Sequence, residues 1–108
     1  MNEIDDEVQS LIEAVKQSKV YRQYDMQRTI LKGEPELKKQ VDEYRIRSYE
    51  IQNAEDDEHL QERIEAFEAE YADFVEQPKV CEFLEAELDL CRMLQEVTAR
   101  VVDSLNFE

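Results

Sequence analysis

The single histidine, His59, is the first residue to consider for chemistry, because a carboxylate stands three positions before it. Asp56 and His59 have the spacing of the metal-ligating pairs in di-metal carboxylate bundles, and Glu62 follows one turn later. Such bundles need two of these pairs and further inward-facing carboxylates, and the chain has no second histidine. The pattern therefore indicates the solvated start of a helix, and we expect no metal site there.

The two cysteines, Cys81 and Cys91, stand ten residues apart in the most apolar run of the chain. On one helix this spacing separates them by roughly 80° around the axis and about 15 Å along it. A disulfide needs Cα atoms within about 7 Å, so these two thiols cannot bond to each other or share a metal ion. We interpret both as small apolar side chains of a buried helix. A metal site or cluster completed by cysteines of a partner chain is an open alternative.

Other reactive groups stand in no catalytic context. The serines and aspartates form no nucleophile motif, and one glycine cannot build a phosphate-binding loop. Glu87 lies on an apolar helix face between Leu84 and Cys91, where a carboxylate must meet a cation, a hydroxyl or water. We expect a structural ion pair there, because no second titratable group is placed beside it. The tyrosines are typical of core or interface positions. The sequence thus predicts no catalytic residue, no cofactor and no enzymatic activity.

The composition predicts one all-α domain spanning residues 1–108. One glycine and two prolines leave few places to turn, 38% of the residues are charged, and no alternating strand pattern occurs. The formal net charge of −15 repels nucleic-acid phosphates and anionic membranes, so we expect no direct DNA binding and no membrane association. No charged-then-apolar leader occupies Met1–Ser18, and we expect a cytoplasmic protein with reduced thiols.

Local signals divide the chain into about five helices. Apolar residues from Ile4 to Val15 recur at spacings of four, three and four, which predicts a first helix. Ser18 is a candidate cap of a second helix, which Gly33 would end in a left-handed conformation, and Pro35 opens a third. The apolar stripe of the third helix, ending at Ile51, is out of register with the stripe that follows.

That loss of register predicts a turn at residues 53–57, with an aspartate capping a fourth helix. The fourth helix has its own stripe of Leu60, Ile64, Phe67, Tyr71 and Phe74. Pro78 opens a fifth helix, which is apolar on more than one face up to Phe107. We therefore predict a helical bundle with a long, largely buried C-terminal helix. Its expected core residues are Leu84, Leu90, Leu94, Val97 and Val101.

Charge is distributed unevenly along the chain. Residues 16–47 carry nine basic and five acidic side chains, whereas residues 53–77 carry ten acidic side chains and Arg63 alone among Lys and Arg. This pattern favours antiparallel packing of the basic segment against the acidic one, within one chain or across a dimer. A contact of the basic segment with RNA or with an acidic partner is the alternative. Exposed ion pairs contribute roughly 0–1 kcal/mol each, so they set orientation more than stability.

Two predicted helices carry apolar residues on a second face. Ile46 and Tyr49 lie about 160–200° around the helix from Tyr44 and Ile51, and the second helix shows the same doubling. Contiguous exposed apolar patches usually mark interaction sites, so we predict a homo-oligomer, most simply a dimer built on the third and fourth helices. The predicted partner-binding residues are Ile46, Tyr49, Met26, Ile30, Arg45 and Arg47.

The spacing of several residues resembles the YlbF/YmcA family of small bacterial helical regulators. The N-terminal part of the resemblance is carried by Ser18, Tyr21, Tyr24, Leu31, Pro35-Glu36-Leu37, Val41 and Tyr44. The C-terminal part is carried by Val80, Phe83-Leu84, Ala86-Glu87 and Leu90. Glu34 precedes Pro35 where the family often has aspartate, and Gln77 precedes Pro78 where asparagine is usual.

The resemblance implies a non-enzymatic helical protein that assembles with itself or with related proteins. Members are linked to competence, sporulation and biofilm control, and to a complex that assists ribonuclease Y in mRNA processing. Some share iron–sulfur clusters through cysteines near the C-terminus, and residues 106–108 contain no cysteine. An acidic helical chaperone or adaptor for a basic client protein is the alternative function, and a carboxylate metal enzyme is a third hypothesis.

These patterns predict that the purified protein binds no stoichiometric zinc, iron or nucleotide, because no ligand set is assembled by the sequence. Elemental analysis after anaerobic purification measures this directly. One or more metal ions per chain would contradict the prediction.

Overall fold

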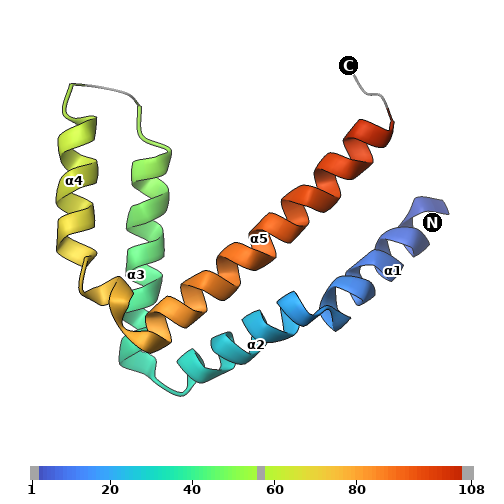
Figure 1. The fold of residues 1–108 in the computed structure, drawn as a ribbon, viewed down its shortest axis with the longest axis horizontal. Coiled ribbons are helices and arrows are strands. Elements are labelled where there is room, and N and C mark those ends of the chain that lie inside the picture. The colour runs from blue at the N-terminus through green and yellow to red at the C-terminus, as the bar shows by residue number, and fades with distance from the viewer. Residues whose placement is uncertain (1–2, 56–57, 106–108) are drawn as a thin grey trace. The chain divides into compact units, whose positions relative to one another are not determined.

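The computed structural model describes residues 3–55 and 58–105, and these form five α-helices and one short 3-10 helix (Figure 1). In chain order they are α1 (Glu3–Gln17), α2 (Lys19–Lys32), α3 (Pro35–Gln52), α4 (Leu60–Tyr71), η1 (Phe74–Glu76) and α5 (Pro78–Ser104). None of the described residues is in a strand. The predicted all-α class, with a long last helix, is confirmed.

Ser18 separates α1 from α2, as its capping chemistry predicts. Its Oγ accepts a hydrogen bond from the backbone N–H of Tyr21 at 3.1 Å and donates one to the carbonyl oxygen of Val15 at 2.6 Å. One hydroxyl thus satisfies a backbone donor at the start of α2 and a carbonyl at the end of α1. The two helices are therefore joined by a single non-helical residue.

The predicted left-handed conformation of Gly33 is wrong. Its backbone lies outside the positive-φ region, and its N–H donates to the carbonyl of Ile30 at 3.1 Å. The N–H of Glu34 donates to the carbonyl of Leu31 at 2.9 Å. The end of α2 is therefore closed by hydrogen bonds between residues three apart, which make a tighter turn than the α-helix. Glu34 makes the change of direction, with φ −134° and ψ 79°. The reason is Pro35, which excludes the helical conformation from the residue before it.

The predicted turn after the third helix is confirmed, but its predicted cap is not. α3 ends at Gln52 and α4 begins at Leu60, with His59 at the N-cap position and no capping hydrogen bond from its side chain. The candidate capping aspartates, Asp56 and Asp57, lie outside the described residues. Phe74, expected on α4, belongs to η1 instead, because α4 ends at Tyr71.

The backbone contacts divide the chain into two compact units, with boundaries inside α2 and α5. One unit comprises residues 29–82 and contains α3, α4 and η1. Its most buried side chains are Val41, at 1% exposure, and Val80, at 0%. In the same unit, an ion pair between Lys79 and Glu34 ties the start of α5 to the α2–α3 connection.

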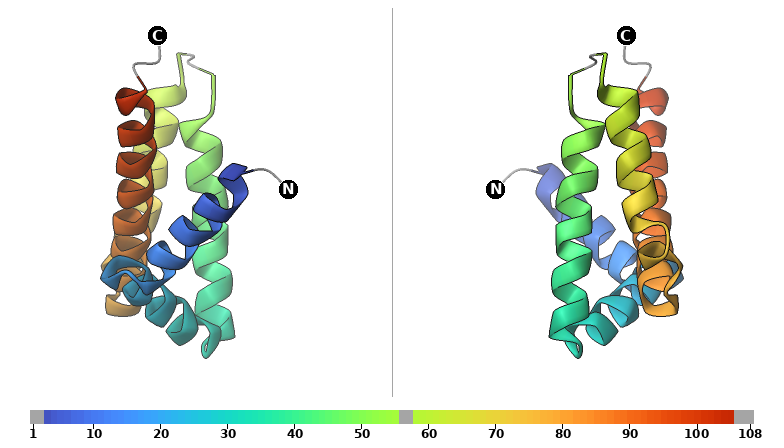
Figure 2. Two further views of the ribbon diagram at one scale, coloured as in Figure 1. Left: turned by 90° about the vertical axis from the view of Figure 1, so that its right-hand side faces the viewer. Right: turned by 90° about the vertical axis from the view of Figure 1, so that its left-hand side faces the viewer.

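The other unit comprises residues 1–28 and 83–108. Gln27, Phe83 and Ala86 are buried in it, and the rings of Tyr24 and Phe83 have centroids 5.8 Å apart. Helix α1, which belongs to the same unit, contains no buried residue. Figure 2 shows α1 diverging from the C-terminal half of α5. Apolar side chains of both helices are exposed, among them Leu11 of α1 and Val101 of α5.

The expectation that α5 is enclosed along its length is therefore wrong in the single chain. Leu94 and Val101, both expected in the core, are exposed, while Leu84, Leu90 and Val97 are half-buried. Cys91 is exposed and Cys81 is half-buried. The sequence has apolar residues on more than one face of α5, but the single chain buries only side chains in the first part of the helix. No helix among the described residues has the length and apolarity to cross a membrane.

Two adjacent residues of α2 test this division into buried and exposed positions. Leu31 is 3% exposed and Ile30 is 38% exposed. Leu31→Ala should lower the free energy of unfolding by about 2–5 kcal/mol, because it removes buried methyl groups and leaves a cavity. Ile30→Ala, the matched control, should cost markedly less. Urea unfolding followed by circular dichroism at low protein concentration measures both, and equal losses would mean that α2 is turned differently.

Candidate interaction site on the α3–α4 hairpin

An aromatic cluster joins α3 to α4. The ring of Tyr44 stacks on that of Phe67, with centroids 5.4 Å apart and an interplanar angle of 18°. Tyr71 meets Tyr44 edge-on at 5.0 Å, and Phe74 of η1 lies 6.0 Å from Tyr44. Aromatic pairs at these distances contribute about 0.5–1.5 kcal/mol each beyond the area that they bury. The two helices run side by side in opposite directions, as Figure 1 shows.

Arg47 closes this hairpin with both charge and ring contacts. Its Nη1 donates hydrogen bonds to Glu70 and, at 3.1 Å, to the hydroxyl of Tyr71. Its guanidinium also lies 5.1 Å from the ring centroid of Tyr71 and 5.6 Å from that of Phe67, a cation–π arrangement. The hydrogen bond to Glu70 is the main reason that the pKa of Arg47 is raised. A basic residue of α3 thus meets an acidic residue of α4 within one chain.

The opposite face of α3 is open. Ile46 is 59% exposed and Tyr49 is 68% exposed, so these two apolar side chains of the hairpin face solvent. Tyr44 and Arg47, two residues before and one residue after Ile46, are turned toward α4 by the contacts above. Of the predicted partner-binding residues, Met26 and Ile30 are exposed on α2, and Arg45 is exposed on α3. Arg47 instead contacts α4.

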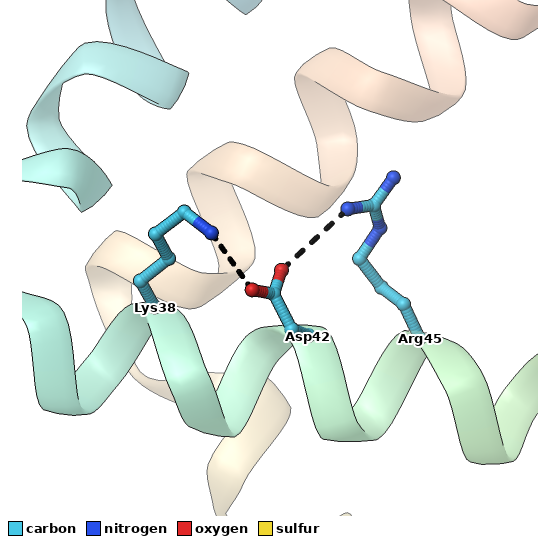
Figure 3. A network of polar contacts seen from close by, with 3 residues as sticks. All are labelled: Lys38, Asp42 and Arg45. Carbon is cyan, nitrogen blue, oxygen red and sulfur yellow. Dashed lines mark hydrogen bonds and ion pairs between the residues drawn. The ribbon is translucent and has the colours of Figure 1, made fainter.

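Charged side chains line the open face beside Ile46 (Figure 3). The Nζ of Lys38 lies 2.8 Å from one carboxylate oxygen of Asp42, and Nη1 of Arg45 lies 3.8 Å from the other. One aspartate is therefore shared by two cations that lie a turn away on either side. Lys32, Pro35, Lys39, Glu43 and Ile46 line a shallow groove with Lys38 and Asp42. We call Lys38, Asp42, Arg45, Ile46 and Tyr49 the outer face of α3.

The other residues considered for chemistry are not part of this face. His59 is exposed, with Nε2 3.2 Å from Glu58 and Nδ1 3.5 Å from Glu62, and the Asp56 of its predicted pair is outside the described residues. Within residues 3–55 and 58–105, no three His, Cys, Asp or Glu side chains are grouped so that they could hold a metal ion. Glu87 is half-buried.

Sequence reasoning missed the arrangement around Arg47. The chain signals it only indirectly: Tyr44 lies on the apolar stripe of α3, while Phe67 and Tyr71 lie on that of α4. Antiparallel pairing of those stripes brings the rings together. The position of Arg47 at the edge of the same face, three residues after Tyr44, could have placed its guanidinium among them.

A small all-helical protein, with a closed aromatic hairpin and exposed apolar side chains on its helices, has the features of a protein that binds other proteins. The chain belongs to the YlbF/YmcA family, because the family model described as "Control of competence regulator ComK, YlbF/YmcA" matches residues 4–106. The predicted resemblance is thereby confirmed, and the match supports a regulatory role. Neither curated proteins nor solved structures gave a significant match.

The aromatic cluster generates a pH prediction. Burial, with smaller contributions from Glu68 and Tyr71, raises the pKa of Tyr44 above the ordinary tyrosine value of 10.0. The folded state therefore holds the phenol proton to higher pH than the unfolded state does. The stabilisation is fully present below pH 10 and is lost as the pH rises from 10 through the folded-state pKa. Thermal unfolding from pH 8 to 11.5 should show this loss, and Tyr44→Phe should make it smaller. An unchanged alkaline slope in Tyr44→Phe would contradict the assignment.

Proposed function

We propose that this protein is a non-enzymatic regulatory subunit that acts through helix-mediated assembly, with the outer face of α3 as its contact surface. The match to a family described by control of a competence regulator supports the regulatory part of the proposal. The observation that carries the assembly part is the exposure of Ile46 and Tyr49 on a helix whose other face is already occupied by α4.

The two sides of α3 have different roles in this proposal: one packs against α4 and the other is free to contact a partner. Tyr44 and Arg47 hold the hairpin closed on one side, so the backbone under Ile46 and Tyr49 is ordered before any partner arrives. Binding then costs little additional ordering of the chain, which raises affinity for a given contact area. Tyrosine is also among the side chains enriched at the energetic centres of interfaces.

The charges around these two residues favour an acidic partner surface. Lys38, Lys39 and Arg45 lie on or beside the outer face, whereas the exposed side of α4 carries Glu62, Glu65 and Glu68. A second copy of the chain, or a related helical protein, can offer such an α4. A two-fold arrangement would set each basic α3 beside the partner's acidic α4, and each contact would occur twice.

The finer assignments follow from the family resemblance. We place the protein in the cytoplasm, in an assembly that acts in competence, sporulation or biofilm control, or that assists ribonuclease Y in mRNA processing. Regulation by such an assembly needs contact surfaces and no catalytic group. The outer face of α3 meets that requirement.

Sedimentation of a charge-substituted variant tests the surface. Ile46→Glu should shift the protein toward smaller assemblies at tens of micromolar, because burying the new carboxylate without a partner is unfavourable. Gln40→Glu, which adds the same charge on another exposed side of α3, should leave association unchanged. A wild-type monomer at this concentration, or equal effects of the two variants, would exclude the outer face as a self-association site.

The charge contribution has its own salt signature. Arg45→Glu should weaken association more at low salt than at high salt, because screening reduces the attraction between exposed charges. Arg63→Glu, the same change on acidic α4, should not weaken it. Arg45 is the better test residue than Arg47, because Arg47 also supports the hairpin. Equal weakening by Arg45→Glu at both salt concentrations would contradict an electrostatic role.

A further inference from the structure

From Leu88 onward, α5 and the residue that follows it carry an exposed stripe with the spacing of a coiled-coil seam. The intervals along the stripe are three, four, three, four and three residues, so its members fall on one side of the helix. They are Leu88, Cys91, Gln95, Thr98, Val102 and Leu105, which we call the α5 seam. Each is exposed in the single chain, and none is charged. All lie within one compact unit.

We infer that the α5 seam is a self-association surface, on which α5 of a second copy lies antiparallel about a two-fold axis between Gln95 and Thr98. In this register Leu88 lies opposite the partner's Leu105, and Cys91 opposite the partner's Val102. The same contacts recur in the opposite sense, as a two-fold interface requires. The seam spans 18 residues, or about 27 Å of helix. This surface is separate from the outer face of α3.

Apolar residues at the edge of the seam also meet apolar residues of the second copy in this register. Leu94 and Val101 lie on one side of it, and antiparallel pairing brings Leu94 beside the partner's Val101. The exposed large hydrophobic residues from Pro78 to Leu105 are Leu88, Leu94, Val101, Val102 and Leu105. All five acquire an apolar neighbour from the second copy. Such a match is the reason for choosing a second copy over an unrelated helix as the occupant.

Polar and charged residues also form favourable pairs in this antiparallel register. Gln95 meets the partner's Thr98 at the centre, where an amide and a hydroxyl can form a hydrogen bond and fix the alignment. On the side of the seam opposite Leu94, Arg92 lies close in height to the partner's Asp103, which gives two opposite-charge pairs by symmetry. In a parallel pair these two residues would be separated by about 16 Å along the axis.

Helix α1 leaves the seam open and extends its apolar edge. Leu11 of α1 lines an open groove with Val97 and Val101 of α5 and with Leu105, which directly follows that helix. Leu105 belongs to the seam, and the other three side chains form its apolar boundary on the side of Val101. A partner helix seated on the seam therefore also covers part of α1, which has no buried residue of its own.

Disulfide trapping tests both the surface and its direction. In a Cys81→Ser background, Val102→Cys places a thiol opposite the partner's Cys91. Mild oxidation with glutathione at tens of micromolar should convert most of this variant to a covalent dimer. Cys91 alone should give almost none, because the two Cys91 residues would lie about 16 Å apart along the axis, beyond disulfide reach. Cys81→Ser/Cys91→Ser/Val102→Cys is the matched control and should also stay monomeric on a denaturing gel.

The outcomes separate this inference from the proposed function. Trapping that persists in an Ile46→Glu version of the Val102→Cys variant supports the seam whether or not the α3 surface associates. Trapping that is lost with Ile46→Glu, or equally efficient trapping through Cys91 alone, overturns the antiparallel seam. Sedimentation of Val102→Glu without introduced cysteines gives a second readout, with Ser104→Glu as control on another side of α5. A smaller assembly than wild type is expected for Val102→Glu and not for Ser104→Glu, and equal behaviour of the two variants overturns the seam.

Discussion

The structure depends on one constraint: the single chain has more apolar helix surface than it can bury. Hydrophobic residues make up 42% of the sequence, yet within residues 3–55 and 58–105 the buried ones are Leu31, Val41, Phe67, Val80, Phe83 and Ala86. All belong to α2, α3, α4 and the first part of α5. Small domains bury a smaller fraction of their surface than large ones do, and long helices with few turns make the deficit greater. The remaining apolar stripes are exposed in the single chain.

The α3–α4 hairpin shows how the chain satisfies one face of a helix and leaves the other available. Aromatic stacking and the contacts of Arg47 occupy the side of α3 toward α4. The outer face keeps Ile46 and Tyr49 in solvent among cations that share Asp42. Because the closed side fixes the backbone, the open side is presented in a defined geometry. This arrangement is what supports the proposed contact surface on the outer face of α3.

The strong negative charge acts on assembly more than on folding. With a net charge of −15, two copies repel each other at long range, so association must rest on short-range apolar contact and locally opposite charges. The two proposed surfaces, the outer face of α3 and the α5 seam, would meet this need differently. The first is basic and can attract the acidic α4 of another molecule, whereas the second is uncharged along its centre and complements itself.

The sequence by itself determined the helices, because their limits rest on local chemistry. Ser18 caps α2, Pro35 and Pro78 open α3 and α5, and the shift of apolar register after Ile51 marks the turn before α4. Periodicity also indicated correctly that Tyr44 and Ile46 face opposite ways. Gly33 was misassigned, because the constraint that Pro35 places on Glu34 outweighed the conformational freedom of glycine.

Tertiary structure alone decided which apolar faces are covered. Leu94 and Val101 have the same pattern as the buried Phe83 and Ala86, but burial depends on whether another segment reaches that height of α5. Likewise, composition indicated pairing between basic and acidic segments, whereas only the packed hairpin selected Arg47, through its place beside Phe67 and Tyr71. The periodicity of apolar residues shows that one face of a helix is more stable when another segment packs against it. It does not say whether that neighbour comes from the same chain, because both remove the same apolar surface from water.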